Sequence, residues 1–323
     1  MLRLLLRRAA HGVLIVWLVA TATFFLLHLA PGDPIAASLD SPLTPPAVRA
    51  HYRHVYGLDQ PLSAQYGRWL AMMTHGDFGF SFPHRRPVSA VIASALPNTL
   101  LLMGVALVLA FAAGIALGLL QARHRGRPLD WGLGLGSLFF YSMPDFWLAL
   151  MLLFLFAFVW RVFPVTGMFD PVMYPYYGFW QRIGDRLWHL VLPACTLALL
   201  SAAAIARFQR AALLDVSGED FVLTARAKGV SERRVLMHHV LRNALLPVIT
   251  LFGLALPVLL GGSVFVEKVF SWPGMGLLTV EAIGTRDYPL LCAAVVIASV
   301  LVIAGSFIAD ALYAVVDPRV RLE

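Results

Sequence analysis

Six long apolar runs constrain the fold of this chain more than any other feature. An α-helix needs about 20 apolar residues to cross the hydrocarbon core of a bilayer, and lipid admits only helices and closed barrels as spanning structures. The runs cover residues 9–30, 99–120, 133–160, 187–206, 244–266 and 290–316. Because 59% of the 323 residues are hydrophobic and only 13% are charged, they predict an all-α integral membrane protein with six transmembrane helices.

The first run also has features of a secretory signal peptide. Basic residues precede it, and Ala20, Thr21 and Ala22 are small enough for a cleavage site. The run is about 22 residues long, however, whereas the apolar core of a signal peptide has about 7–15. A retained membrane anchor is therefore the favoured interpretation.

The distribution of Lys and Arg predicts the orientation. If the N-terminus is cytoplasmic, 15 of the 25 basic residues lie in inner segments and five in the two short outer loops. The other five lie in the long first loop, which is too long to count in the positive-inside rule. Both termini are therefore predicted to be cytoplasmic in a multi-pass protein of the cell inner membrane. Attraction to anionic membrane lipid accounts for the net charge of +7, so no nucleic-acid partner is expected.

The spans and loops suggest three parts: an anchor span (1–30), an extracytoplasmic loop subdomain (31–98) and a five-helix core (99–323). Turn residues in the loop alternate with two expected helices, "TPPAVRAHYRHVYGL", opened by Thr44 and Pro45, and "LSAQYGRWLAMM", with Ser63 as N-cap. The loop suits a lid or a docking surface.

Cys195 and Cys292 both lie in spans, so no disulfide is implied.

A basic segment, 217–242, interrupts the apolar chain between the fourth and fifth spans. Ser217, with Asp220 three residues later, resembles a capping box that starts a helix. Gly229 is expected to end this helix, and Ser231 followed by Glu232 to start a second one that runs toward the fifth span.

The first of these helices is predicted to be amphipathic. Phe221, Ala225 and the methylene stem of Lys228 fall near one face. The small residues Ala225, Ala227 and Gly229 leave room for close approach of a partner. Three interpretations remain open on the residues alone: an interfacial helix on anionic lipid, a DNA-binding helix-turn-helix, and a lever that fits into a groove on a cytoplasmic motor subunit. The DNA interpretation is disfavoured because both ends of the segment are tied to the bilayer.

Motifs along nearly the whole chain carry a family resemblance. They occur in the order "HLAPGDP", "YGLDQPLSAQYGRWL", "GDFGFSF", "SMPDFWLAL", "FPVTG", "LPACTLAL", "DFVLTARAKG", "VFSWPGMG" and "DALYAVVDPR". Together they resemble the permeases of binding-protein-dependent ABC transporters, in the dipeptide, oligopeptide and nickel branch. The resemblance implies a second homologous permease subunit, two cytoplasmic ABC ATPase subunits and an extracytoplasmic solute-binding protein. It implies peptide transport, with nickel chelates or another small solute as alternatives.

The basic segment is similar to the ATPase-coupling loop of that family. Ala225 matches the second alanine of the family's Glu-Ala-Ala stretch and Gly229 its glycine, whereas Arg242 replaces a proline and the glutamate is missing. The resemblance therefore supports the helix-glycine-helix shape but no role for that glutamate. The predicted ATPase-coupling residues are Glu219, Asp220, Ala225, Ala227, Lys228, Gly229 and Ser231.

The segment "VEKVFSWPGMG" after the fifth span is the second candidate surface. Its Pro and Gly residues are typical of a tight turn. The predicted contacts with the binding protein are Trp272, Pro273, Gly274 and Gly276. A purely structural re-entrant cap is the alternative interpretation.

The sequence lacks the means to hydrolyse ATP through a P-loop. That motif needs Gly-Lys-Ser/Thr, but the two lysines, Lys228 and Lys268, follow Ala227 and Glu267. Energy must come from another chain or from an ion gradient. An ion-coupled secondary transporter is the less favoured alternative, because few ionisable residues lie in the spans. The candidates are His28, His189, Asp145 and Asp310, with Asp145 interpreted first as a local cap.

A membrane enzyme is also disfavoured. His51 and His54, and the adjacent His238 and His239, lack the Glu and the spacing of a zinc protease motif. Neighbouring residues on a helix point about 100° apart, so His238 and His239 are poorly placed to share an ion. No cofactor, metal site or catalytic residue is predicted.

Overall fold

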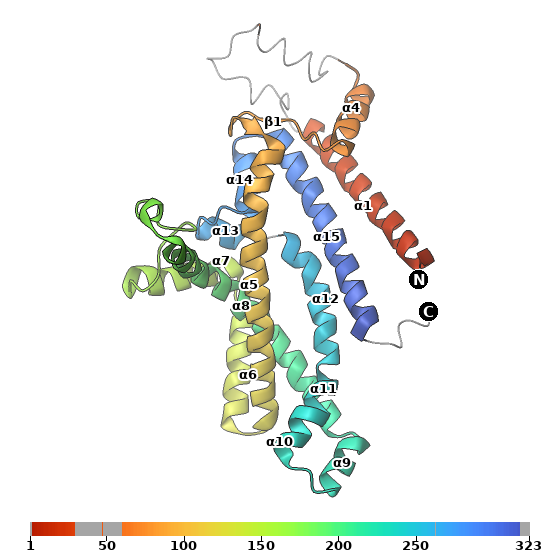
Figure 1. Ribbon diagram of the computed structural model, residues 1–323, viewed down its shortest axis with the longest axis vertical. Coiled ribbons are helices and arrows are strands. Elements are labelled where there is room, and N and C mark those ends of the chain that lie inside the picture. The colour runs from red at the N-terminus through yellow and green to blue at the C-terminus, as the bar shows by residue number, and fades with distance from the viewer. Residues whose placement is uncertain (1, 30–46, 48–59, 262, 317–323) are drawn as a thin grey trace. The chain divides into compact units, whose positions relative to one another are not determined.

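The computed structural model describes residues 2–29, 47, 60–261 and 263–316 (Figure 1). They form helices, with one short hairpin. The first part of the chain contains α1 (Leu2–Leu29), α4 (Leu62–Thr74), β1 (Phe80–Ser81), β2 (Arg86–Pro87), α5 (Val88–Arg123), α6 (Pro128–Tyr141), α7 (Asp145–Leu153), η1 (Phe154–Val159), η2 (Tyr174–Tyr176) and α8 (Phe179–Ser217). The second part contains α9 (Asp220–Ala227), α10 (Glu232–Arg234), η3 (Val235–Val240), α11 (Leu241–Ala244), α12 (Leu246–Gly261), α13 (Val264–Val269), α14 (Met275–Gly284) and α15 (Tyr288–Val316).

Four helices in the described part of the chain are long and apolar enough to cross a membrane. They are 8–29 in α1, 88–123 in α5, 179–217 in α8 and 288–309 in α15. Two bent pairs raise the number to six if each pair is one span: α6 with α7 and η1, and 232–244 with 246–255. The largely helical, multi-pass character predicted from the apolar runs is thus confirmed.

The third apolar run, 133–160, is not a straight helix. The chain bends by 105° between Tyr141 and Asp145. Pro144 causes the break because it lacks an N–H, and its ring disfavours the helical conformation in the residue before it. Its own backbone is extended, at φ −62° and ψ 138°, and its carbonyl accepts the first hydrogen bonds of α7. A second correction is the antiparallel hairpin of β1 and β2 within the outer loop, where only helices and turns were expected.

The chain divides into two compact units, 1–99 with 273–303, and 100–272 with 304–323. In the first unit, the start of α5 packs against α14 and α15 through the buried side chains of Val91, Ile92, Leu278, Leu290 and Ala293. The α4 helix packs on α1, because the rings of Tyr66 and Trp69 lie 5.4 Å and 5.3 Å from that of Phe24. The predicted N-cap, Ser63, is instead inside the first turn of α4, which follows Pro61. The other helix expected in this loop, 44–58, lies outside the described residues apart from position 47.

A buried carboxylate ties the hairpin to α15. The hydroxyl of Ser81 donates a short hydrogen bond to Asp287, and the Leu290 N–H donates to the same carboxylate at 3.3 Å, which makes Asp287 the N-cap of α15. His84 Nδ1 lies 3.0 Å from the Ser81 hydroxyl and 3.8 Å from Asp287. Burial raises the pKa of Asp287 above its ordinary value, against the opposing effects of Ser81, Leu290 and His84.

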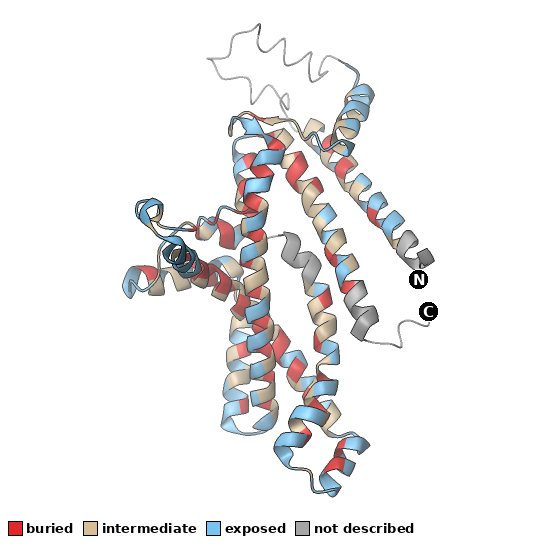
Figure 2. Cartoon of the chain, viewed as in Figure 1, coloured by how far each residue is buried: buried red, intermediate tan, exposed pale blue. Residues whose placement is uncertain are grey.

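The second unit is built around α8. In the most apolar stretch of 18 residues in α8, 61% of the residues are buried, compared with 17% in the corresponding stretch of α1. Figure 2 shows where the buried residues lie along the helices. The α5 helix meets α8 almost backbone to backbone at Gly114 and Gly118, where an added Cβ would lie 2.6 Å from Ile205 Cβ and 2.8 Å from the Ala206 carbonyl oxygen. The spacing of these two glycines is the small-xxx-small pattern that lets membrane helices approach closely. At the end of α8, Arg210 forms a bidentate pair with Asp130 of α6, both bonds being 2.8 Å.

We expect Gly118→Ala to destabilise the protein by about 1–3 kcal/mol. The added methyl group would meet a backbone oxygen that no side-chain rotation can move aside. Gly104→Ala is the matched control in the same helix, because nothing lies within 4 Å of its added Cβ. Thermal unfolding of the purified variants in detergent measures the difference. Equal midpoints for the two variants would contradict the close packing of α5 on α8.

The raised pKa of Asp287 predicts that the hairpin is held more firmly at low pH. A carboxyl whose folded pKa is raised contributes most stability below its unfolded pKa, 3.8, and loses that contribution as the pH rises through the folded value. Exchange of the His84 amide, corrected for the intrinsic rate, should therefore speed up with rising pH. Asp287→Asn should remove this dependence while it keeps an N-cap. A pH dependence that survives in Asp287→Asn would exclude the Asp287 carboxyl as its origin.

Candidate functional site

The segment 217–242 begins differently from the capping-box prediction. Ser217 is the last residue of α8, and its hydroxyl donates to the Leu213 carbonyl at 2.6 Å, so it does not cap the next helix. The α9 helix follows Glu219, whose backbone carbonyl accepts hydrogen bonds from Val222 and Leu223. Asp220 lies in the first turn of α9, where a carboxylate favours the positive end of the helix dipole.

Of the residues predicted to share one face of α9, only Ala225 is buried. Val222 and Ala225 are buried against Leu213 of α8 and against Val235 and Val240 of η3. Phe221 and Lys228 are exposed instead. These five buried residues therefore join α9 to the end of α8 and to η3, which leads through α11 into α12.

Gly229 ends α9 as predicted, in a complete Schellman motif. Its φ is +74°, in the left-handed region that glycine adopts without strain. The Gly229 N–H donates to the backbone carbonyl of Arg226 at 2.9 Å, and the Val230 N–H donates to the backbone carbonyl of Ala225 at 3.2 Å. Val230 packs against the same buried cluster. The direction in which the chain leaves α9 is thus fixed by backbone hydrogen bonds.

The second helix starts after Ser231, as predicted, although the Ser231 side chain makes no capping hydrogen bond. An ion pair spans the turn, with Arg226 Nε 2.9 Å from Glu232 Oε1. The helix passes through the π-helical turn η3 and α11, and then bends by 43° into α12. The segment 217–242 therefore forms a packed loop, α9-turn-helix, between α8 and α12.

Most of the predicted coupling residues lie on the outside of this loop. Exposed side chains or backbone are found at Glu219, Asp220, Ala227, Lys228, Gly229 and Ser231. Ala225 is buried in the loop, so it is placed to position α9 rather than to touch a partner. Sequence reasoning missed the exposed apolar side chains of Phe221 and Leu223, which are 44% and 50% exposed. Exposed apolar side chains on one short helix are typical of a surface that contacts another molecule.

Comparison with known proteins identifies the family. Residues 114–322 match the binding-protein-dependent transport system inner membrane component family, and residues 1–103 match the N-terminal part of such membrane components. The chain belongs to this family.

The relatives named below match this permease over nearly their whole length. It is 42% identical over 318 residues to the oligopeptide transport system permease protein AppB of Bacillus subtilis (strain 168), covering 98% of each chain. It is 36% identical over 339 residues to the dipeptide transport system permease protein DppB of Escherichia coli (strain K12), covering 99% of each. The glutathione transport system permease protein GsiC of Salmonella paratyphi A (strain ATCC 9150 / SARB42) is 39% identical over 323 residues and 99% of each.

A solved structure shares the fold of the permease. The inward-facing MetNI methionine ABC transporter matches with a TM-score of 0.56 at 18% sequence identity, over 70% of this chain and 96% of that one. Family membership and a multi-pass location in the inner membrane, both expected from the sequence, are thereby confirmed.

The second candidate surface of the permease is largely buried. Trp272 is 0% exposed in a cluster with Leu102 and Met168. Gly274 and Gly276 are also buried, and of the four predicted contacts Pro273 is exposed. The Pro273 carbonyl accepts a hydrogen bond from the Asn98 amide at 2.8 Å. This geometry favours the structural cap that the sequence left open as an alternative.

The remaining polar candidates make local contacts. Asp145 is the first residue of α7 and accepts a hydrogen bond from the Phe146 N–H at 2.8 Å, whereas the N-cap of the helix is Pro144. His189 Nδ1 lies 2.8 Å from the Asp185 carbonyl, and His28 Nδ1 lies at the same distance from the Phe24 carbonyl. Over the described ranges, no group of three His, Cys, Asp or Glu residues is placed to hold a metal ion. His51, His54 and the Asp310 side chain lie outside those ranges.

The backbone at Gly229 predicts a specific sensitivity of the loop. Gly229→Ala should cost about 1–2 kcal/mol, because an L-residue is strained at positive φ. Trypsin should then cleave after Lys228 about tenfold faster, since the loop opens more often. Gly218→Ala is the matched control, because Gly218 has φ −89° and an ordinary 3.5 Å contact for the added Cβ. Equal cleavage rates for both variants would contradict the Schellman geometry as the origin of the rigidity.

Proposed function

We propose that this permease forms half of the translocation pathway of an ABC importer and receives the motion of an ATPase subunit through α9. The exposed face of α9 carries the proposal. Phe221, Leu223 and Ala227 point away from the loop, while Val222 and Ala225 anchor it from inside. A rigid element with exposed apolar side chains suits a groove on a partner better than it suits water. The carboxylates of Glu219 and Asp220 and the ammonium of Lys228 supply polar contacts at its ends.

The proposed topology has six spans and both termini in the cytoplasm. The two bent pairs count as spans three and five. The excess of Lys and Arg in the segments on the inner side supports this orientation, because positive charge resists translocation. It places α9 between spans four and five on the cytoplasmic side, where ATP is available to the partner. The loop of residues 31–98 is then extracytoplasmic and accessible to a solute-binding protein.

Motion at α9 reaches the membrane through two connections. Leu213 at the end of α8 and Val240 before α11 both pack on α9, so a shift of α9 displaces both helices together. The turn at Gly229 does not absorb that shift, because its backbone hydrogen bonds are complete. The 43° bend before Leu246 is the place where such a displacement becomes a tilt of α12.

A cavity in the second unit supports a transport pathway. It has a volume of about 570 Å³ and lies among α5, α7, α8, α12 and α13. Its lining is mostly apolar, as at Leu107 and Phe265, with the hydroxyls of Ser201 and Ser263 and the carboxyl of Asp145. A lining with few polar groups fits weak selectivity, and discrimination then falls to the solute-binding protein.

Peptides are the proposed cargo. The relatives named above are permeases for oligopeptides, dipeptides and glutathione, which is itself a tripeptide, and they match over nearly the full chain. The complete machine has a second homologous permease subunit, two cytoplasmic ATPases and an extracytoplasmic solute-binding protein. A nickel chelate or another small solute is the alternative cargo, because the sequence of the pathway subunit does not specify the ligand of the binding protein.

A charge placed on α9 tests the proposal. In liposomes that contain the assembled transporter, Ala227→Glu should abolish the stimulation of ATP hydrolysis by peptide-loaded binding protein and reduce peptide uptake at least tenfold, because a buried unpaired carboxylate opposes docking. The matched control is Ala211→Glu, which adds the same charge to an exposed alanine on α8, outside α9 and outside the 31–98 loop. The control should retain both activities.

Three outcomes would contradict parts of this proposal. Wild-type activity in Ala227→Glu would exclude α9 as the contact with the ATPase. Uptake that continues without ATP and follows an ion gradient would favour the secondary transporter. Stimulation by a binding protein loaded with a nickel chelate, but not with peptides, would change the cargo and leave the coupling unchanged.

A further inference from the structure

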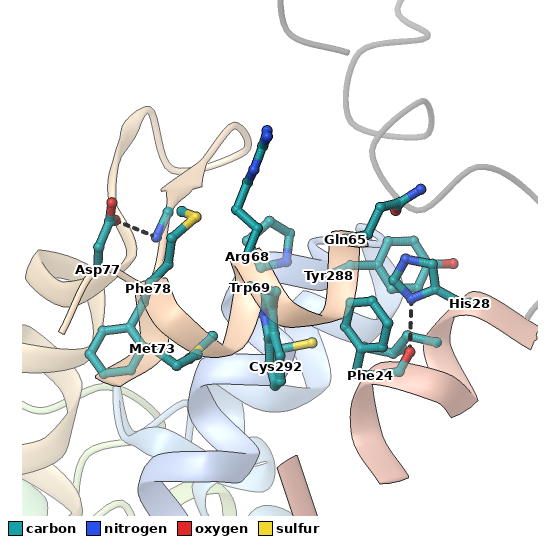
Figure 3. A pocket seen from close by; sticks show the side chains of 14 residues that line it. Phe24, His28, Gln65, Arg68, Trp69, Met73, Asp77, Phe78, Tyr288 and Cys292 are labelled. Carbon is teal, nitrogen blue, oxygen red and sulfur yellow. Dashed lines mark hydrogen bonds between the residues drawn. The ribbon is translucent and has the colours of Figure 1, made fainter. Parts of the chain in front are cut away.

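A pocket in the first unit has no place in the transport mechanism described above. It has a volume of about 100 Å³ and is lined by α1, α4, the 77–79 turn and the start of α15 (Figure 3). This volume exceeds the about 10–15 Å³ that a single water molecule requires. It is too small for a whole lipid or peptide, but it admits a segment of an acyl chain.

The floor of the pocket is apolar. Phe24, Trp69, Met73 and Cys292 face one another below the rim (Figure 3). Phe24 and Cys292 are buried, at 3% and 6% exposure. An apolar cavity of this kind favours a hydrocarbon over water, since it offers few hydrogen-bond partners.

The rim of the pocket is polar and carries a guanidinium and a carboxylate. Arg68 and Gln65 extend from α4 above the floor, and His28 lies at the end of α1 (Figure 3). Arg68 Nη2 is 3.2 Å from the Gln60 side chain, which leaves further guanidinium N–H groups for a ligand. The carboxylate at the rim, Asp77, accepts a hydrogen bond from the Gly79 N–H at 3.0 Å.

The pocket lies at the level of a bilayer surface. His28 is one residue from the end of the candidate span 8–29, and Tyr288 is the first residue of the candidate span 288–309. Trp69 and Tyr288 are aromatic residues of the kind enriched where the hydrocarbon core meets the headgroups. The apolar floor below this level matches the acyl chain of a phospholipid, and the guanidinium of Arg68 above it matches the phosphate.

We propose that this pocket binds one anionic phospholipid. A segment of an acyl chain enters between Phe24, Trp69 and Cys292, and the phosphate accepts hydrogen bonds from Arg68. The lipid joins α1, α4 and α15, which each contribute to the pocket. It thereby holds α4 at the membrane surface. This proposal does not depend on the cargo or on the contact with the ATPase.

Cys292 provides the probe. The chain has two cysteines, so Cys195→Ser leaves Cys292 as the single thiol of the full-length protein. This variant is reconstituted in phosphatidylcholine vesicles with and without phosphatidylglycerol and treated with an apolar N-alkyl maleimide. Phosphatidylglycerol should slow modification of Cys292 about tenfold, since its phosphate charge is not neutralised by a choline ammonium, as it is in phosphatidylcholine, and is attracted more strongly to the guanidinium. Arg68→Glu in the same background should remove the protection.

Arg86→Glu is the matched control, because Arg86 is exposed on β2 and does not line the pocket. It should keep the protection by phosphatidylglycerol. All variants should show the same modification rate in phosphatidylcholine alone, which verifies that the pocket is intact. Native mass spectrometry of the detergent-extracted chain should find one retained phosphatidylglycerol in the control and none in Arg68→Glu.

Other occupants give different results. Equal modification rates with and without phosphatidylglycerol would overturn the proposal. Equal protection in Arg68→Glu would overturn the assignment of the phosphate to Arg68. Protection that occurs only when a solute-binding protein is added would identify a protein side chain as the occupant instead.

Discussion

The close approach of α5 to α8 at Gly114 and Gly118 is the contact on which the second unit depends. In lipid, helices gain little from hiding apolar surface, so association relies on close packing and on polar contacts between helices. The two glycines let backbone meet backbone, and no larger residue fits beside Ile205 and Ala206. Once α8 is fixed in this way, α6, α7, α12 and α13 pack against its other faces.

The same helix also positions the loop that contains α9. With 39 residues, α8 is about 58 Å long, roughly twice the thickness of the hydrocarbon core. Its surplus length carries Arg210, paired with Asp130 of α6, and then Leu213, on which α9 packs. In this pair the Asp130 carboxylate is buried and Arg210 is partly exposed, so an arrangement of the two helices that separated them would leave a buried carboxylate without its partner. The end of α8 is therefore a defined base for α9 rather than a flexible connection.

The apolar runs predicted the helices well because the bilayer requires about 20 residues whatever their order. They did not predict the 105° bend in the third run. In a segment that is apolar on all sides, periodicity carries no information about direction, and Pro144 is compatible with both a kinked and a broken helix. Ser217 was misassigned for a related reason. Its hydroxyl has a competing acceptor one turn back, the Leu213 carbonyl, and sequence spacing does not say which partner prevails.

The two candidate surfaces show what residue type alone leaves undetermined. Phe221 falls near the same face as the buried Ala225 and is exposed, whereas Trp272 is predicted to meet a partner and is fully buried. Both are aromatic residues near a glycine, so composition treats them alike. The difference lies in the packing around them. The buried face of α9 is centred between Val222 and Ala225, and Phe221 lies at its edge, where its side chain stays exposed. A surface that meets another chain therefore becomes visible only when the local packing has fixed which side of the helix is already occupied.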